Sequence, residues 1–241
     1  MPIAVGSIAW LSAAANGDGR CFNPQPCSSA GAGLLAPTNS ACRLCGAPGW
    51  ILGWCVGFSD CSALLLAQWA AGSMGGIHAW FGADGAAWQR LVDLLEHRPT
   101  QPLRGEGVQG GVAEGPLVVT NLTIATSLIG TRWLPSLKGA ILVLEDTGEA
   151  PYRIDRQLTQ WRASGLLAGV AGIGLGRFSW AEDDVLPGDF SMDEILLERL
   201  APLGVPLVRH LPLGHGQPNQ PLPLGRRARL DGVSGALSLL A

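Results

Sequence analysis

The sequence is poor in charge and has no basic surplus. Only 15% of its 241 residues are charged, and the formal net charge is -3. Nucleic acids and anionic membranes favour basic partners, so we expect neither as a partner. No uninterrupted apolar segment has the length that spans a bilayer. No Lys or Arg precedes Arg20. The charged start of a secretory signal is therefore missing, and we expect a cytoplasmic protein.

Cysteine is present, but not in a recognised metal-binding pattern. Cys42 and Cys45 form a C-x-x-C pair, and Cys21 and Cys27 would complete a set of four. The spacing of Cys21 and Cys27 is not that of a zinc ribbon, and no strand-turn context supports a metal site there. We interpret the thiols as incidental and expect no metal and no other cofactor.

Composition divides the chain into unequal regions. Apolar residues make up 47% of it, which supports a substantial core, and the length suits one large or two small domains. Residues 16–49 are rich in Gly, Pro, Ala and Cys, a composition that suits neither strand nor helix. The Pro, Gly and charge content of residues 98–111 marks a linker. We predict an N-terminal domain over residues 1–97 and a C-terminal domain over residues 112–241.

A serine lies where a predicted strand meets a predicted helix. Residues 51–56 form an apolar run, a tight turn follows, and a helical pattern begins at Asp60. Ser59 at this junction is either a helix N-cap, which is common, or a nucleophile on a sharp elbow. In the second case, backbone N–H groups at the helix start can hold an oxyanion. The elbow pattern G-x-S-x-G is only half matched by Gly57-Phe58-Ser59-Asp60-Cys61, and the local pattern favours the cap.

Carboxylates follow the most clearly buried strand. Residues 140–144 are apolar, and Glu145 and Asp146 come directly after them. A turn at Thr147-Gly148 separates this strand from a helix that follows Pro151. Functional carboxylates in α/β proteins lie at the carboxyl ends of buried strands, although a solvated acidic turn explains the pattern equally well.

Two histidines are candidates for chemistry. His215 lies between Gly214 and Gly216, so its ring can be approached closely, although loop histidines are common on surfaces. His78 is a candidate ligand or base, but a histidine after an apolar residue is more often only packed. A junction serine, a strand-end carboxylate and a glycine-flanked histidine suit a nucleophile, an orienting acid and a general base.

The remaining pattern predicts alternating helices and strands. A helix is expected over residues 84–96, and Ser191 and Glu194 form a capping box at the start of another. Further strands are expected at residues 167–175, 205–210, 228–230 and 236–240, with an acidic loop over residues 180–189.

Taken in order, these motifs resemble the L,D-carboxypeptidase family of serine peptidases, which includes microcin-immunity-type enzymes. The resemblance runs roughly from Trp50 to the carboxyl terminus. It rests on Gly57-Phe-Ser-Asp60, Gly115-Pro-Leu with Asn121-Leu122, Leu128-Ile-Gly-Thr131, Leu144-Glu-Asp-Thr-Gly-Glu149, Pro151-Tyr-Arg-Ile-Asp-Arg156, Gly214-His215 and Pro223-Leu-Gly225.

The resemblance implies an α/β fold: an incomplete Rossmann-like N-terminal nucleophile domain and a smaller, β-rich, swivelling C-terminal domain. It also implies a Ser-Glu-His triad, with Ser59 as nucleophile, Glu145 as acid and His215 as base. The backbone N–H of Asp60, at the helix start, is the natural first oxyanion donor.

The implied reaction releases the terminal D-alanine from murein tetrapeptide, a small peptide substrate, in the cytoplasm. The family further implies a homodimer and no metal. Two alternatives stay open: an amide hydrolase of aminoacyl-nucleotide toxins, and an inactive remnant of the family.

The sequence departs from the family pattern before Trp50. Members carry an Arg-Gly-Gly-Tyr/Trp-Gly segment ahead of the nucleophile strand, and residues 16–49 stand in its place. We interpret this region as truncated, rearranged or translated out of frame. Smaller departures are Val119-Thr120, where glycines are usual, and Ala79-Trp80 after His78, where Gly-Pro is common.

Overall fold

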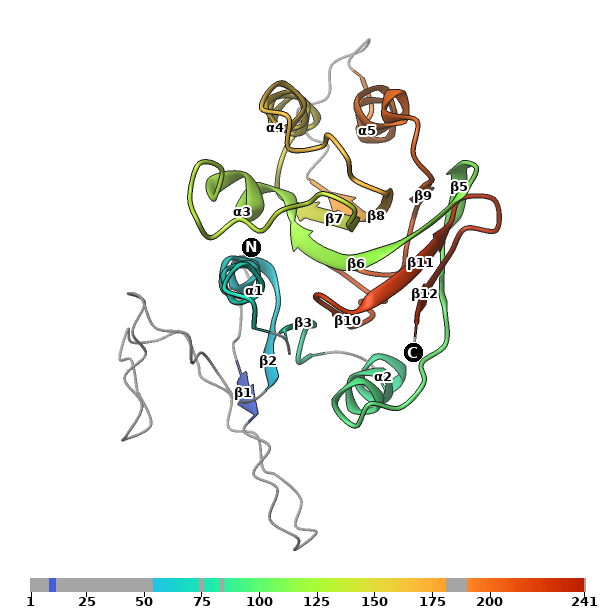
Figure 1. Ribbon diagram of the computed structural model, residues 1–241. Coiled ribbons are helices and arrows are strands. Elements are labelled where there is room, and N and C mark those ends of the chain that lie inside the picture. The colour runs from blue at the N-terminus through green and yellow to red at the C-terminus, as the bar shows by residue number, and fades with distance from the viewer. Residues whose placement is uncertain (1–8, 12–53, 74–75, 83–84, 181–189, 241) are drawn as a thin grey trace, which may run out of the picture.

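The computed structural model describes residues 9–11, 54–73, 76–82, 85–180 and 190–240, which form an α/β fold with two sheets (Figure 1). The smaller sheet has the order β1-β2-β3-β10. Its strands are β1 (Ala9–Leu11), β2 (Trp54–Gly57), β3 (Gly76–His78) and β10 (Leu222–Pro223). The predicted α/β class is confirmed.

The larger sheet has eight strands in the order β4-β12-β11-β6-β7-β8-β9-β5. They are β4 (Leu103–Arg104), β12 (Ala236–Leu239), β11 (Arg227–Asp231), β6 (Val112–Asn121), β7 (Ile141–Thr147), β8 (Gly172–Ser179), β9 (Leu207–Arg209) and β5 (Glu106–Gln109). The central strands β6 to β9 run parallel. A strand buried on both faces of a parallel sheet is continuously apolar, and this is the pattern of β7.

Helices cover the larger sheet. On one side lie α3 (Leu122–Ser127), α4 (Pro151–Ala163) and α5 (Met192–Leu200) (Figure 1). Helix α1 (Ser62–Ala70) lies next to α3. Pro151 is at the first turn of α4, where its missing N–H costs nothing. The predicted capping box is confirmed, because Ser191 and Glu194 bond reciprocally at the start of α5.

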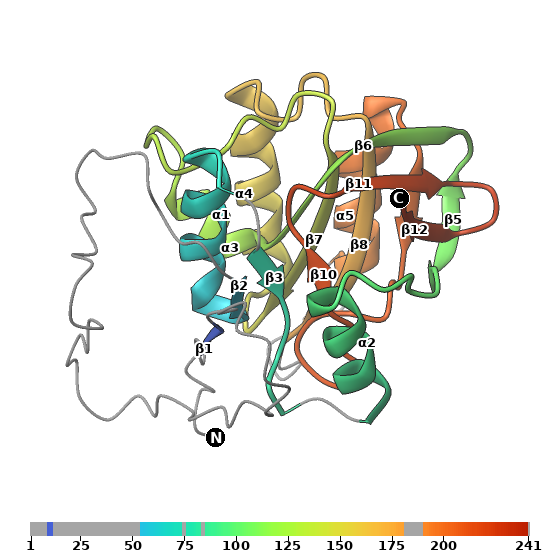
Figure 2. The same cartoon turned by 60° about the horizontal axis from the view of Figure 1, so that its bottom comes forward.

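The smaller sheet joins distant parts of the chain. Strands β2 and β3 are parallel, and β10 pairs antiparallel with β3 (Figure 2). Helix α2 (Gly85–Leu95) follows β3 and matches the helix predicted over residues 84–96. Because β10 comes from the C-terminal part of the chain, the two halves are interlocked at this sheet.

Some boundaries differ from the predicted ones. The predicted linker, residues 98–111, contains β4 and β5, which gain partners in β12 and β9 from far along the chain. Strand β8 begins at Gly172, because residues 165–170 form turns with Gly165 and Gly169 at positive φ. Residues 16–49, 51–53 and 181–189 lie outside the described residues. Among the helices described, none is both long and apolar enough to cross a bilayer.

Candidate active site

Ser59 lies on a strained turn between β2 and α1. Its φ is 60°, in the left-handed region that non-glycine residues rarely adopt. The preference for a helix cap is wrong: Phe58 and Cys61 occupy the cap positions, and the Ser59 hydroxyl instead faces His215. Strained backbone conformations of this kind cluster at active sites.

Gly57 is required by the tightness of this turn. A Cβ at Gly57 would lie 2.6 Å from the Cβ of Cys61, closer than two carbons can approach. The first glycine of the elbow pattern is therefore needed here. The fifth position, occupied by Cys61, tolerates a small side chain.

Glu145 lies near the carboxyl end of β7 and is fully buried. The pairing of β7 with β8 shifts register between Leu144 and Asp146, and such an irregularity re-aims side chains. Asp146 turns to α3, where it accepts hydrogen bonds from the backbone N–H and hydroxyl of Thr123, each 2.8 Å long. Burial raises the pKa of Asp146, and the bonds from Thr123 oppose that rise. The solvated-turn interpretation is therefore wrong for these two carboxylates.

His215 lies in a loop that Arg177 of β8 fastens from one side. The Arg177 guanidinium donates to the carbonyl oxygens of His215, at 3.3 Å, and Gln217, at 2.7 Å. Gly214 and Gly216 have φ values of 109° and 113°. A Cβ at Gly216 would collide with the Arg177 guanidinium. The glycines that flank His215 therefore let the loop close over Arg177.

The three predicted residues form one hydrogen-bonded chain. His215 Nδ1 lies 2.8 Å from Glu145 Oε2, and His215 Nε2 lies 3.2 Å from Ser59 Oγ. If Nδ1 carries the proton and donates it to the carboxylate, Nε2 is free to accept the serine proton. This is the contact pattern of a nucleophile, base and orienting acid. Asp60 follows Ser59 and is exposed, and its role as an oxyanion donor stays a prediction.

Comparison with known proteins points in the same direction. Residues 114–230 match the LD-carboxypeptidase C-terminal domain. A putative carboxypeptidase of Synechocystis sp. is 46% identical over 191 residues, 78% of this chain and 64% of that protein. The murein tetrapeptide carboxypeptidase of Pseudomonas aeruginosa is 37% identical over 61% of this chain and 47% of its own length. These matches identify residues 114–230 as an LD-carboxypeptidase C-terminal domain.

A solved structure extends the likeness beyond the matched domain. Muramoyltetrapeptide carboxypeptidase from Oxalobacter formigenes superposes with a TM-score of 0.66 at 26% identity, covering 76% of this chain and 65% of that one. The chain thus spans less than two thirds of the length of the curated relatives above. The domain match includes Glu145 and His215 but not Ser59. The assignment of Ser59 therefore rests on the elbow and on its contact with His215.

Two residues, Arg177 and His78, have positions at the candidate active site that the sequence alone does not indicate. Arg177 reads in the sequence as an ordinary strand arginine, yet it supports the loop of His215. The sequence indicates His78 only as a candidate ligand or base, or as a packed ring. It is fully buried, and its Nε2 lies 4.0 Å from the second oxygen of Glu145.

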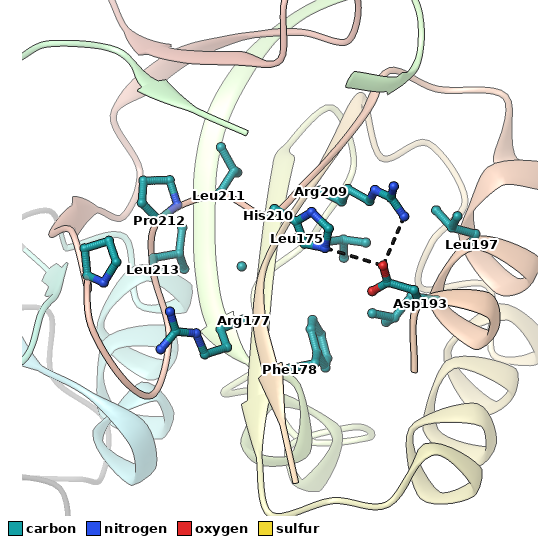
Figure 3. Close-up of a pocket in the computed structure, with 13 residues that line it drawn as sticks. Leu175, Arg177, Phe178, Asp193, Leu197, Arg209, His210, Leu211, Pro212 and Leu213 are labelled. Carbon is teal, nitrogen blue, oxygen red and sulfur yellow. Dashed lines mark hydrogen bonds and ion pairs between the residues drawn. The ribbon is translucent and has the colours of Figure 1, made fainter. Parts of the chain in front are cut away.

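A separate cavity of about 450 Å³ lies between β8, α5 and the segment that follows β9 (Figure 3). Arg177 lines it, but its guanidinium points away from Asp193 and donates to the loop of His215. Asp193 pairs there with Arg209 at 3.0 Å and with His210 at 3.4 Å. Ser59, Glu145 and His215 do not line this cavity, so it is distinct from the candidate active site.

Metal-binding groups are not assembled in the described part of the chain, where no cluster of three His, Cys, Asp or Glu side chains occurs. Burial raises the pKa of Cys55 to about 12 and also raises that of Cys61, so both remain protonated thiols. The other four cysteines fall outside the described residues.

Proposed function

We propose that this protein is a serine-type carboxypeptidase that cleaves the L,D-peptide bond of murein tetrapeptide and releases the terminal D-alanine. The observation that carries the proposal is the continuous hydrogen-bonded chain from Ser59 Oγ through His215 to Glu145. Relatives named as murein peptide carboxypeptidases support the choice of substrate.

The chemistry follows from the position of each group. Ser59 Oγ attacks the carbonyl carbon that precedes D-alanine, and His215 Nε2 takes the hydroxyl proton. His215 then gives that proton to the leaving amine, and a water molecule releases the acyl group from Ser59 by the same route in reverse. Glu145 holds the imidazole in the required tautomer and balances its positive charge. The Asp60 N–H stabilises the oxyanion, a contribution typically worth about 3 kcal/mol.

The accessibility of these groups suits a small peptide. Glu145 is fully buried, whereas 17% of the His215 side chain is exposed and Asp60 is open to solvent. A substrate therefore reaches the hydroxyl and the imidazole, while the carboxylate stays away from water. A carboxylate in such a dry setting interacts more strongly with the imidazolium than a solvated one would.

Incubation of the full chain with murein tetrapeptide, followed by measurement of free D-alanine, tests the proposal. The parent is expected to release D-alanine, and the same peptide ending in L-alanine is expected to stay intact. Ser59→Ala and His215→Ala, each alone, should remove nearly all turnover. Ser127→Ala, which changes an exposed hydroxyl on α3, is the matched control and should keep it. Near-parent turnover in either triad variant would overturn the assignment.

A fluorophosphonate probe separates the alternatives. Labelling of Ser59 without D-alanine release would move the protein to another amide substrate, and an aminoacyl-nucleotide is the first to assay. Folded protein that takes no label would be a remnant without hydrolase activity.

A cytoplasmic location, a homodimer and the division at residues 98–111 belong to the same proposal. Sedimentation of the purified chain tests the dimer. Limited proteolysis tests the division, because cleavage should concentrate between residues 98 and 102, before β4 begins.

A further inference from the structure

His78 stands between the chain segments that build the active site. Its strand, β3, pairs with β2 so that His78 lies opposite Gly57, two residues before Ser59. On its other edge, β3 pairs with β10 so that His78 lies opposite Leu222, where the loop of His215 ends. The next residue, Ala79, donates its N–H to the Gly57 carbonyl at 2.9 Å. The backbone of His78 is thereby fixed to both the serine segment and the histidine segment.

The side chain of His78 faces the third member of the triad. Its Nε2 lies 4.0 Å from Glu145 Oε1, the oxygen that does not contact His215. Phe58 lies between the two histidines, with ring centroids 5.1 Å from His78 and 4.5 Å from His215. The two imidazoles therefore flank the Glu145 carboxylate and share one aromatic wedge.

Glu145 and His78 face each other with buried polar atoms that need hydrogen-bond partners. Glu145 Oε1 and both ring nitrogens of His78 are fully buried and have no hydrogen-bond partner among the described residues. A buried carboxylate oxygen without a donor is costly, so such groups are normally paired. Nε2 of His78 is within about 1 Å of hydrogen-bond distance to that oxygen, by the usual limit of about 3 Å. A shift that shortens the distance between His78 Nε2 and Glu145 Oε1 by about 1 Å would give both atoms a hydrogen-bond partner.

The charge state of His78 suits a donor rather than a second base. Burial lowers the pKa of His78 to about 4, and the neighbouring Glu145 opposes this shift only in part, while His215 adds to it. The ring is therefore neutral at pH 7 and carries a single N–H. The ionisable groups near Glu145 are His78 from β3, His215 from its loop and Asp146, the next residue along β7.

The geometry points to His78 as a positioning residue that donates its Nε2–H to Glu145 Oε1 and thereby fixes the carboxylate that orients His215. It touches neither substrate nor reacting atoms. Its contribution is to prevent Glu145 from rotating away from His215 as positive charge develops on the imidazole. This inference rests on the proposed function for its kinetic consequence, but not for its structural one.

Three variants of His78 in the full chain separate positioning from packing. His78→Gln places an amide N–H near the position of Nε2, His78→Asn reaches only the position of Nδ1, and His78→Leu has no donor. We expect kcat for D-alanine release to fall about 10- to 100-fold in the Asn and Leu variants, with KM changed less than about twofold. The Gln variant should stay within about threefold of the parent.

The contrary result is equally specific. Parental kcat in His78→Leu, or losses in all three variants that follow only their melting temperatures, would overturn the inference. A rise in KM with kcat unchanged would also overturn it, because a group that acts through Glu145 does not bind the peptide.

Nitrogen-15 NMR of the imidazoles supplies a test that needs no turnover and no folded variant other than His78→Gln, which assigns the signal. We expect His78 in the Nε2–H tautomer at pH 7. The Nδ1–H tautomer would overturn the inference. Because this readout is made on the parent chain, the expected tautomer in a protein that releases no D-alanine would count against the proposed function alone.

Discussion

The two sides of the candidate active site differ in the size of the strands and of the buried core that support them. Glu145 lies on the larger sheet, whose parallel strands share one extensive buried cluster with helices α3 to α5, and the loop of His215 begins after β9 of that sheet. Ser59 comes from the smaller sheet, where β2 has four residues and β3 three. Among the described residues, a separate small cluster beside this sheet has Val56, Ile77, Ala79, Leu91 and Leu94 as its buried members, whereas Cys55 of β2 and Leu65 and Leu66 of α1 belong to the extensive cluster.

The two sides therefore hold their functional groups by different means. The carboxylate and the imidazole are held by a deep core and by a side chain, Arg177, that braces the loop. The hydroxyl is held by a strained backbone and by a turn so tight that a Cβ at Gly57 would collide with Cys61. We therefore expect an added Cβ to lower turnover more on the Ser59 side than in the loop of His215.

The largest expected effect comes from removing the negative charge of Glu145 while keeping the packing around its side chain. Glu145→Gln should lower kcat on the order of 10³- to 10⁴-fold, because an amide neither fixes the required tautomer of His215 nor balances its charge. D-alanine release and the melting temperature measure the two consequences separately. The control is Glu149→Gln, a partly exposed carboxylate four residues on that pairs with Arg153 at 3.4 Å. It should keep turnover, and a large loss there would transfer the acid role to Glu149.

The next effect tests the strained side. Gly57→Ala should lower kcat about 100-fold, because the new Cβ meets the Cβ of Cys61 and the elbow must move, and misplacement of a reacting group by about 1 Å costs on this order. Gly85→Ala is the control, since a Cβ there meets nothing within 4 Å. Adding Cys61→Gly to Gly57→Ala should restore part of kcat. No recovery in this double variant would mean that the contact does not position Ser59.

A third, smaller effect appears in the acid stability of the Ser59 side. His78 has a folded-state pKa of about 4 against an ordinary value of 6.5. The unfolded chain therefore takes up a proton below pH 6.5, while the folded chain does so only near pH 4. The stability that the neutral ring contributes is complete above pH 6.5 and is lost as the pH falls toward 4.

Urea unfolding measures this loss. Between pH 7 and pH 5, the free energy of unfolding of the parent should fall about 2 kcal/mol more than that of His78→Gln, at about 1.4 kcal/mol for each pKa unit. Equal losses in the two proteins would show that His78 is not buried in its neutral form.

Much of the larger sheet and of the helices that cover it could be predicted from local sequence. The apolar run of β7, Pro151 at the start of α4 and the capping box at Ser191 follow from short-range rules, and the structure has each of them. The hairpin of β11 and β12 follows in the same way from two apolar runs around Asp231-Gly232. In these cases one segment contains all the residues that decide its conformation.

The Ser59 side could not be predicted in this way, because contacts between distant residues decide it. Ser59 and His215 are 156 positions apart, and the five residues around Ser59 favour a cap when read alone. His78 gains its position from β10, which lies far along the chain. Strands β4 and β5 cannot be predicted from their own residues for the same reason, because their pairing depends on the distant strands β12 and β9.

The smallest expected effect comes from adding a side chain in the loop of His215, where the neighbouring Arg177 side chain can move aside. Gly216→Ala places a Cβ against the guanidinium of Arg177, the far end of a flexible side chain that can move aside. We expect kcat to fall only about tenfold, because the bonds from Arg177 to the loop weaken while the core stays intact; this is about 1.4 kcal/mol. Gly130→Ala, at a φ of 82° with open space around it, reports the backbone strain alone. A greater loss in Gly216→Ala than in Gly57→Ala would reverse the comparison and make the loop of His215 the more demanding side.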